Sequence, residues 1–498
     1  MSKKLKGSLT IFFSLIMVSV MTLIFAMTEC IRLYEMHSIG QEYTDMAVES
    51  AFSEYNPYLW TNYRILAVDL GYGTETIGPS ILQQKTLEYC GYNANVDTGK
   101  NYARLFPNNC DATKYSLLTD ENGQGIIMLG VKAAKDGMAA QIIDGVQSCS
   151  NNINGVEKIS VEEQTESASK DLQDARDANA ADKEAAANDD DPNTNPSDYP
   201  DPGRVEDDPL DAYKAMKDVL AKGILSTVVD AEGLSDQEVE INNMPSHRQL
   251  NTGALAVNSG DTLVDKALFV DYLLSNYSYY GNDLKHDGLK YEIEYLVTGQ
   301  ESDVLALSTV VADLMLIRES ANYLTILQNP SMVAQAAEIA TILAGFTMNP
   351  GLIEAVKYAI IGAWAYIESI LDIRLLLAGG KVSLIKTIDE WTSDVWHLST
   401  FMDTSAKAKQ CQNGIGYKEY LLGFLCIHPD SILAMRAADV MENALNSTED
   451  YKNIKVDNMI FAADISIEYS GSEMFLSLLG QSDESGEYLI KKSKTISY

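Results

Sequence analysis

One apolar segment near the start of the chain constrains the fold more than any other feature. Three lysines lie within the first seven residues, and the run from Ser8 to Met27 that follows carries no formal charge. A bilayer core is about 30 Å thick and a helix rises about 1.5 Å per residue, so this run can span it. The sequence therefore predicts a cytoplasmic basic leader over residues 1–7 and a transmembrane helix over 8–28. The rest of the chain is predicted to lie outside the cell.

The sequence leaves open whether this segment is retained. An uncut signal anchor fits an apolar run that is longer than that of an ordinary secretory signal. A prepilin-type cut between Gly7 and Ser8 fits the short basic leader, although Phe12 stands where such proteins usually carry a glutamate. Ordinary secretion would require cleavage near Ala26-Met27-Thr28.

The predicted helix continues beyond the membrane. From Met36 to Tyr55, apolar residues recur at steps of three and four with acidic residues between them, and Asn56-Pro57 ends the pattern. This predicts an amphipathic stalk helix over 29–56. The stalk could pack on its own outer domain or bundle with pilin-like helices, and the spacing favours the first arrangement.

The composition limits the possible partners. The chain has 71 acidic and 37 basic residues, a net charge of −34, and such a surface repels nucleic acid and anionic lipid headgroups. With 498 residues and 46% hydrophobic content, it can bury two cores. Six cysteines are few for a disulfide scaffold. The pair Cys411 and Cys426 is the candidate disulfide, with Cys90 and Cys110 as a second possibility.

The fold class predicted for the outer part is α+β. Residues 57–160 form a small α+β region with a strand over 63–69, a hairpin of 115–119 with 126–129 around Asn122-Gly123, and a helix over 132–148.

Residues 161–210 differ in composition, with sixteen acidic residues against four basic ones and few aliphatic side chains. They are predicted to form an acidic low-complexity linker, marginally helical over 170–187 and disordered over 188–209.

Residues 211–498 are predicted to form a mainly helical ectodomain with a few strands. Apolar periodicity and caps place its helices at 211–229, 261–280, 303–329, 331–346 and 350–377, its strands near 291–298 and 459–469, and a polar tail at 491–498. The last of these helices is very apolar but contains Glu368, Asp372 and Arg374, so it is predicted to be buried in a soluble domain and not to cross the membrane.

No catalytic or metal-binding motif is present. The five histidines lack metal-ligand spacing, and HExxH, CxxC and GxSxG are absent from the sequence. We therefore predict no catalytic residue, no metal and no cofactor. The charged residues on the predicted buried elements are interpreted as a structural ion-pair network that fixes helix register: Glu292, Glu294, Arg318, Glu319, Glu368, Asp372 and Arg374.

Two parts of the chain resemble known families. The opening Gly7-Ser8-Leu9-Thr10-Ile11-Phe12-Phe13, with the helical run 41–51, is similar to TadE/TadG-like proteins of tight-adherence (Flp-type) pilus systems. Residues 291–391, with Glu294-Tyr295 before Gly299 and Arg318-Glu319 before Trp364 and Glu368-Ser369, resemble an uncharacterised exported, membrane-anchored Firmicutes family. That family is often encoded beside the same pilus machinery.

The resemblance implies a non-enzymatic surface protein of the cell membrane, single-pass with its C-terminal ectodomain outside. Its role would be that of a pseudopilin-like or accessory subunit of a tight-adherence pilus or secretion assembly, with other pilin-like proteins as partners. A stalked adhesin or binding module is the alternative, and a cell-envelope hydrolase is a minor one.

Overall fold

The computed structural model describes residues 6–95, 97, 101–136, 161–189, 195–221, 223–229, 233–256, 263–475 and 487–498. The fold is mixed α+β, as predicted. It divides into two compact units, each assembled from separated segments, whereas the sequence predicted consecutive regions. Unit 1 contains Met1–Ala133, Asn242–Gly260 and Ala437–Tyr498, and unit 2 contains Ala134–Ile241 and Asp261–Arg436.

Unit 1 is built on an antiparallel sheet whose central strand comes from near the C-terminus. Strand β5 (Met459–Ser472) pairs with β2 (Phe106–Leu117) along one edge and with β6 (Glu487–Ser497) along the other. The short strand β1 (Val68–Asp69) pairs with the first residues of β5. The predicted strand near 459–469 is therefore confirmed, and it is the centre of the sheet.

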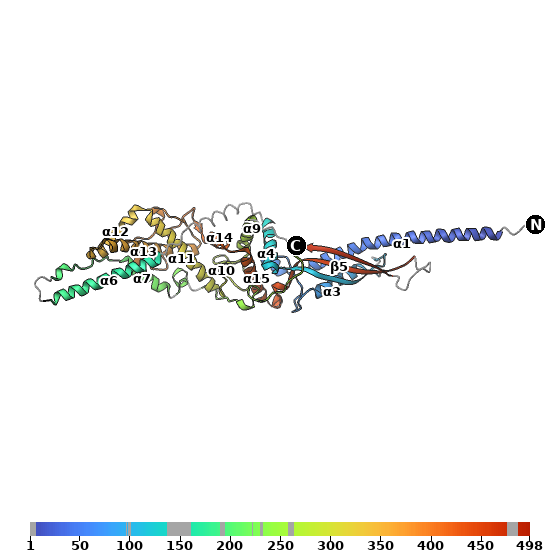
Figure 1. Cartoon of the computed structure of the whole chain (residues 1–498), viewed down its shortest axis with the longest axis horizontal. Helices are drawn as coiled ribbons and strands as arrows, with labels where there is room; N and C mark the ends of the chain where they lie inside the picture. The colour runs from blue at the N-terminus through green and yellow to red at the C-terminus, as the bar shows by residue number, and fades with distance from the viewer. Residues whose placement is uncertain are drawn as a thin grey trace, which may run out of the picture. The chain divides into compact units, whose positions relative to one another are not determined.

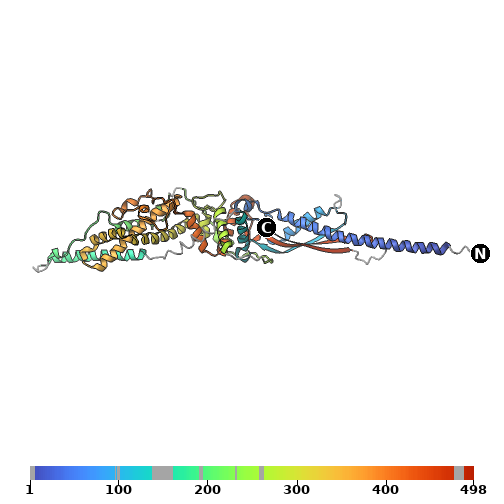
Figure 2. The same cartoon turned by 90° about the horizontal axis from the view of Figure 1, so that it is seen from above.

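Two helices cover one face of this sheet. The helices α1 (Lys6–Phe52) and α3 (Ser80–Asn93), both labelled in Figure 1, contact each other and lie on the same side of the strands in the view of Figure 2. The second half of α1 supplies Met36, Tyr43 and Ala47 to a core that also contains Ile467 and Tyr469 of β5. The stalk thus packs on its own outer domain, because its apolar stripe matches the inward-facing residues of the strand.

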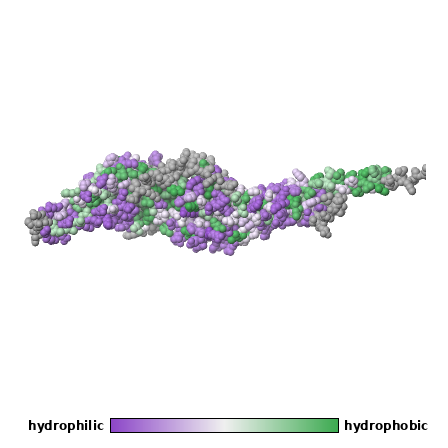
Figure 3. Space-filling model, in the orientation of Figure 1, coloured by the Kyte–Doolittle hydropathy of each residue, from purple (hydrophilic) through white to green (hydrophobic). Residues whose placement is uncertain are grey.

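The first half of α1 has a different environment. Apart from Phe25, its large apolar side chains from Leu9 to Met27 are 44–67% exposed, and they form the apolar surface of α1 in Figure 3. Within the described residues, α1 is the single unbroken helix that is long and apolar enough to cross a membrane. The helices α14 (Tyr417–Ile427) and α15 (Asp430–Asn446) pass the same test together, but the chain bends by 118° between them.

Unit 2 is a helical assembly around one buried helix. Every residue of α13 (Pro350–Leu377) from Ala359 to Leu377 is buried, so the prediction of a buried helix is confirmed. Five helices contact α13: α6 (Val161–Ala187), α7 (Pro209–Leu220), α8 (Leu225–Val228), α11 (Asp303–Leu327) and α12 (Pro330–Ala344). A helix that is apolar on all sides is stable in water only when other elements cover it all round.

Side-chain caps fix where these long helices begin. Ser302 accepts the amide of Leu305 at the start of α11, and Asn349 accepts the amide of Gly351 at the start of α13. The remaining elements are α2 (Pro57–Tyr63), α4 (Asp120–Asp136), α8 (Leu225–Val228), α9 (Leu263–Asn276), α10 (Glu292–Thr298), β3 (Lys381–Val382), β4 (Ile415–Gly416), α14 (Tyr417–Ile427) and α15 (Asp430–Asn446), with short 3₁₀ turns between them.

The strand predicted over 63–69 is wrong for most of its length. Asn56 caps α2, which runs through Tyr63, and Arg64 takes a left-handed conformation at its end with φ 56°. The chain is extended and paired only at Val68–Asp69. An Asn followed by a Pro at the first helical position favours the start of a helix. This local preference determines the structure up to Tyr63, although the apolar run that follows is typical of a strand.

The predicted hairpin around Asn122-Gly123 is also wrong. Glu121, Asn122 and Gly123 do adopt positive φ, but they lead into the rest of α4. Ile126 and Leu129 are buried at helical spacing, and β2 pairs with β5 instead of with this segment. The part of the predicted helix 132–148 beyond residue 136 lies outside the described residues.

The segment 291–298 is helix α10 and not a strand. Apolar and polar residues alternate in this segment, which predicts a strand with one exposed face. The structure has no such face, because every residue from Glu292 to Val297 is buried. Over seven residues a period of two and a period of 3.6 are hard to distinguish. Gly299, at φ 68°, ends the helix.

Two further segments are more ordered than predicted. Residues 161–187 form the single helix α6, which buries Thr165, Ala168 and Leu172 while its acidic residues face solvent, and the described residues 195–209 contain a capped 3₁₀ turn. The predicted polar tail 491–498 is largely part of β6, whose inward-facing side chains include the buried Ile490. Both segments are stabilised by packing partners distant in sequence, which composition does not reveal.

Candidate functional site

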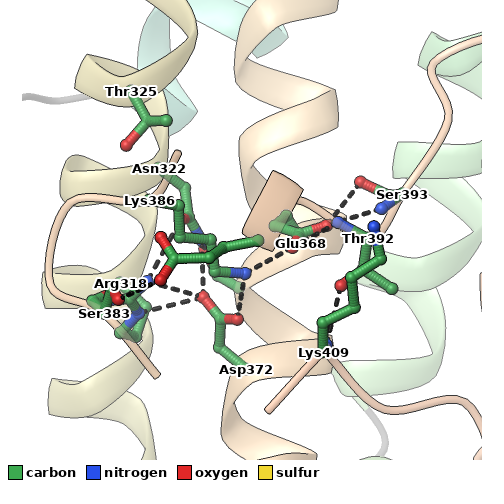
Figure 4. A network of polar contacts seen from close by, with 12 residues as sticks. Arg318, Asn322, Thr325, Glu368, Asp372, Ser383, Lys386, Thr392, Ser393 and Lys409 are labelled. Carbon is green, nitrogen blue, oxygen red and sulfur yellow. Dashed lines mark hydrogen bonds and ion pairs between the residues drawn. The ribbon is translucent and has the colours of Figure 1, made fainter. Parts of the chain in front are cut away.

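The best-defined charged site in unit 2 joins α11, α13 and the segment after α13 (Figure 4). Arg318 of α11 donates from Nη2 to Asp372 of α13 at 2.8 Å and from Nε at 3.0 Å. Lys386 donates from Nζ to both Asp372 and Glu368. None of the four side chains has any exposure to solvent.

Helix geometry explains the position of Lys386. Glu368 and Asp372 lie one turn apart on the same face of α13, so two unpaired carboxylates would repel each other there. The ammonium group of Lys386 contacts both. Although burial alone would raise the pKa of Asp372, the positive charges of Arg318 and Lys386 lower it overall.

Backbone groups complete the site. Glu368 accepts the amides of Thr392 at 3.1 Å and Ser393 at 2.8 Å. Arg318 donates from Nη1 to the carbonyls of Ser383 at 3.0 Å and Leu384 at 3.1 Å. The site therefore fixes residues 381–393 against the two helices.

This arrangement is suited to a structural role. Two cations and two carboxylates are enclosed together, so the group is neutral, and each charge has hydrogen-bond partners. A cavity of about 590 Å³ lies between α6 and α7, but its lining includes none of these four residues. The four side chains therefore do not open onto this cavity.

The two glutamates of α10 form separate contacts. Glu294 accepts from the hydroxyl of Tyr417 at 2.6 Å and from the amide of Tyr280 at 2.9 Å, and burial raises its pKa to about 7. Glu292 accepts from Nδ1 of His286 at 2.9 Å and also bonds the amide of Ser278. These bonds attach the segment before α10 and the start of α14 to the helix.

Glu319 and Arg374 also lie apart from the cluster. Within the described residues, Glu319 Oε1 is buried without a hydrogen-bond partner, and burial together with the negative charge of Glu162 raises its pKa to about 7. Arg374 donates to the backbone carbonyls of Thr227 and Asp403 at 2.9 and 2.6 Å. Of the seven residues predicted as one network, the structure brings together Arg318, Glu368 and Asp372, while the other four lie at three further places.

Unit 1 contains a second charged site that the sequence analysis did not identify. Arg248 donates from Nη2 to Glu442 at 2.8 Å and also pairs with Asp457, and both carboxylates are buried. Ser246 bonds Asp439, one helical turn before Glu442 on α15. The hint in the sequence is the acidic i, i+3 spacing of Asp439 and Glu442 on a helix rich in apolar residues.

The candidate disulfides are not formed in the structure. Cys411 and Cys426 are not joined to each other, and the Cys411 thiol donates to the carbonyl of Lys409 at 3.8 Å. Cys90 and Cys110 are both buried in unit 1, and burial raises the pKa of their thiols to about 11 and about 12. Both therefore remain protonated thiols at neutral pH.

The candidate processing site Gly7-Ser8 lies in the first turn of α1. The structure does not test cleavage there, so it remains a prediction. Among the described residues, no group of three or more histidine, cysteine, aspartate or glutamate side chains is placed to hold a metal ion.

Comparison with known proteins gives one match. A family profile described as a family of unknown function, DUF5702, matches residues 203–471, which is more than half of the chain. The chain belongs to this family. The DUF5702 match contains the charged sites of both units and most of β5, and it begins after α1 and α6. No curated protein and no solved structure matches the chain.

Proposed function

We propose that this protein is a non-enzymatic, membrane-anchored surface protein that serves as a pseudopilin-like or accessory subunit of a tight-adherence type pilus or secretion assembly. The observation that carries the proposal is the division of α1 into two halves. The first half exposes its apolar side chains, and the second half belongs to the core of a folded sheet.

The exposed half requires an apolar environment. Side chains such as Phe12 and Val18 are about 60% exposed, and a contiguous apolar surface of this length is not stable in water. Lipid can cover it, and so can the apolar helices of other subunits. The lysines before it favour an outward orientation of the remaining chain.

The buried charges support a role without catalysis. The carboxylates of α13 are paired and enclosed, and those of α10 bond to backbone amides and neighbouring side chains. Such groups hold helices in register and do not meet a substrate.

The test uses full-length protein in cells that make the assembly. We expect Phe12→Arg to abolish co-purification with the other pilus components, because a charge within the span costs about 3 kcal/mol and disrupts helix contacts. The matched control Phe12→Leu should co-purify like the parent. Unchanged co-purification of Phe12→Arg would contradict the proposal.

Mass spectrometry of the mature protein adds an independent measurement. A first residue at Ser8 would support the pilin pathway, and an intact leader would support a permanent anchor. A first residue near Glu29 would contradict both, since the apolar half of α1 would then be lost.

A stalked adhesin is the second candidate, favoured by a unit 2 that is far larger than an anchor requires. It predicts that cells without the assembly genes still bind a surface through this protein. Loss of that binding in such cells would count against the adhesin.

A further inference from the structure

We propose that Lys386 and Glu368 join covalently, in an amide bond that the folded protein forms by itself from the side-chain amine and carboxyl. The observation behind the proposal is that one buried amine contacts two buried carboxylates. The ion pairs described above are the state before the reaction. The bond belongs to unit 2 and does not depend on the proposed anchoring of α1.

The reacting groups are already in contact. Lys386 Nζ bonds Oε1 of Glu368 and Oδ1 of Asp372, and none of the three side chains has any exposure to solvent. When an enclosed ammonium passes a proton to a carboxylate, the neutral amine and carboxylic acid that result need less hydration than the ions. A neutral amine is a nucleophile, and fixing it beside the carboxyl group replaces an encounter in solution.

The two carboxylates have different partners, which assigns their roles. Asp372 Oδ2 accepts from Arg318 at 2.8 Å and from Asn322 at 2.9 Å. The guanidinium keeps Asp372 ionised, and its other oxygen, Oδ1, is the one that contacts Lys386. Asp372 is therefore placed to accept a proton from the amine, and Glu368 is the carboxyl that is attacked.

Donors around Glu368 stabilise the charge that the attack creates. Glu368 Oε2 accepts from the amide of Ser393 at 2.8 Å and from its hydroxyl at 2.7 Å, as Figure 4 shows. Trp364 Nε1 donates to the same hydroxyl oxygen at 2.9 Å and thereby orients it. When the amine attacks Cδ, negative charge develops on Oε2, where two donors are already directed. The oxygen that leaves is Oε1, which contacts Lys386.

The step balances without another reagent. The bond between Lys386 Nζ and Glu368 Cδ forms, and the bond between Cδ and Oε1 breaks. Oε1 leaves as water with two protons of the ammonium group, one of which passes through Asp372 Oδ1. An ammonium and a carboxylate thus become one amide and one water. Arg318 and Asp372 remain as a neutral pair.

A second lysine of unit 2 has the same arrangement in contact with solvent. Lys217 pairs with Glu162 and Glu166, which are four residues apart on α6, the same spacing as Glu368 and Asp372 on α13. The Lys217 side chain is 34% exposed, and those of the two glutamates are 49% and 53% exposed. Hydration keeps these three groups ionised, so no amide is expected there. Lys217 is the matched control within the same molecule.

The test is peptide mapping of the purified full-length protein, unfolded in denaturant before digestion with trypsin. Trypsin cleaves after Lys357, Arg374, Lys381 and Lys407. An amide at Lys386 blocks cleavage there and joins residues 358–374 to residues 382–407. We expect this linked peptide, lighter than its two parts together by one water, about 18 Da. Fragmentation should place the junction at Glu368, and cleavage after Lys217 should be normal.

Two variants test the chemistry. Lys386→Arg keeps a cation in the site but cannot react, because a guanidinium does not lose its proton in a protein. Its intact mass should exceed that of the parent by the mass of the substitution plus one water, and processing at the N-terminus affects both proteins equally. Asp372→Asn removes the proton acceptor and should yield the separate peptides.

Recovery of residues 358–374 and 382–386 from the parent as separate, unmodified peptides, with no linked peptide, would overturn the amide and leave the ion pairs as described. A junction at Asp372, or full linkage in Asp372→Asn, would contradict the roles assigned to the two carboxylates. An equal degree of linkage at Lys217 would contradict the requirement for an enclosed site.

Discussion

Arg318 and Asp372 form an ion pair of 2.8 Å in which neither side chain is exposed to solvent. The pair joins α11 to α13, and Lys386 extends it to the segment that returns across both helices. Removing one member of a buried pair leaves an uncompensated charge, so each member is expected to be needed for the stability of unit 2.

The first prediction concerns Lys386. Lys386→Met leaves Glu368 without its cation and Asp372 with Arg318 alone, and we expect unit 2 to lose about 3 kcal/mol of unfolding free energy. Hydrogen exchange of the α13 amides measures this loss. The matched control is Lys381→Met, whose exposed pair with Glu419 at 3.8 Å should contribute less than about 1 kcal/mol. Equal protection of α13 in both variants would contradict the structural role.

The second prediction concerns pH and Glu319. Its folded pKa of about 7 exceeds the ordinary value of 4.5, so the folded state favours the protonated form. Stability should therefore fall as pH rises from about 4.5 through about 7. Glu319→Gln should match the parent near pH 4.5 and exceed it by up to about 3 kcal/mol at pH 8. Urea unfolding followed by tryptophan emission measures this, since Trp364 and Trp391 are buried in unit 2.

Glu338→Gln is the control for that experiment, because Glu338 is exposed on α12. Its curves should follow those of the parent at every pH. A Glu319→Gln variant with the same pH dependence as the parent would show that the carboxyl is ionised at no cost in the folded protein.

The third prediction concerns Arg248 of unit 1. Arg248→Met should detach residues 244–256 from α15 and destabilise that attachment by about 3 kcal/mol, because Glu442 and Asp457 remain buried. Arg248→Lys should recover only part of the loss, since an ammonium cannot form the two-nitrogen contact of a guanidinium. Hydrogen exchange of peptides from this segment provides the measurement. Lys114→Met, which removes an exposed pair with Asp464, should leave it unchanged.

The fourth prediction tests whether α6 is an integral part of unit 2. At Gly362 of α13, an added Cβ would collide with Thr165 Oγ1 and lie 3.0 Å from Val161 Cγ1. Gly362→Ala should therefore separate α6 from α13 at a cost of about 1–3 kcal/mol and increase exchange of the α6 amides. Gly345→Ala is the control, since its Cβ would meet only Thr341 Cγ2 at 3.9 Å. Unchanged exchange in α6 would mean that it is not packed there.

The elements predicted correctly are those with long, repeated patterns or clear caps. The helix α1 and the three consecutive helices α11, α12 and α13 each show sustained apolar spacing, and β5 alternates from Ala463 to its end at Ser472. The sequence predicts strands for the short segments 63–69 and 291–298, because so few residues fit the period of a strand as well as that of a helix. The helix α6 is stabilised by packing on α13, and the strand β6 by pairing with β5. Contacts with such distant segments cannot be predicted from the local sequence of α6 or β6.

The candidate site was predictable to the same extent. Glu368 and Asp372 on one helical face, with Arg318 on another predicted helix, indicated a buried pair. The sequence does not predict that Lys386 joins the site. Lys386 follows the glycines that end α13, and the sequence does not show in which direction the chain continues after such a turn. In the sequence, nothing distinguishes Glu319 from the other acidic residues of the predicted network. The structure shows that α6 packs nearby and that, within the described residues, Glu319 Oε1 has no hydrogen-bond partner.

The order of the strands has a consequence for biogenesis. The central strand β5 and its neighbour β6 come after the whole of unit 2 in the chain, so α1 and β2 lack the strand that joins them until unit 2 has been synthesised. A chain cut before Met459 would leave β2 unpaired and the inward face of α1 uncovered. The release of β5 from the ribosome therefore sets the earliest moment at which unit 1 can fold.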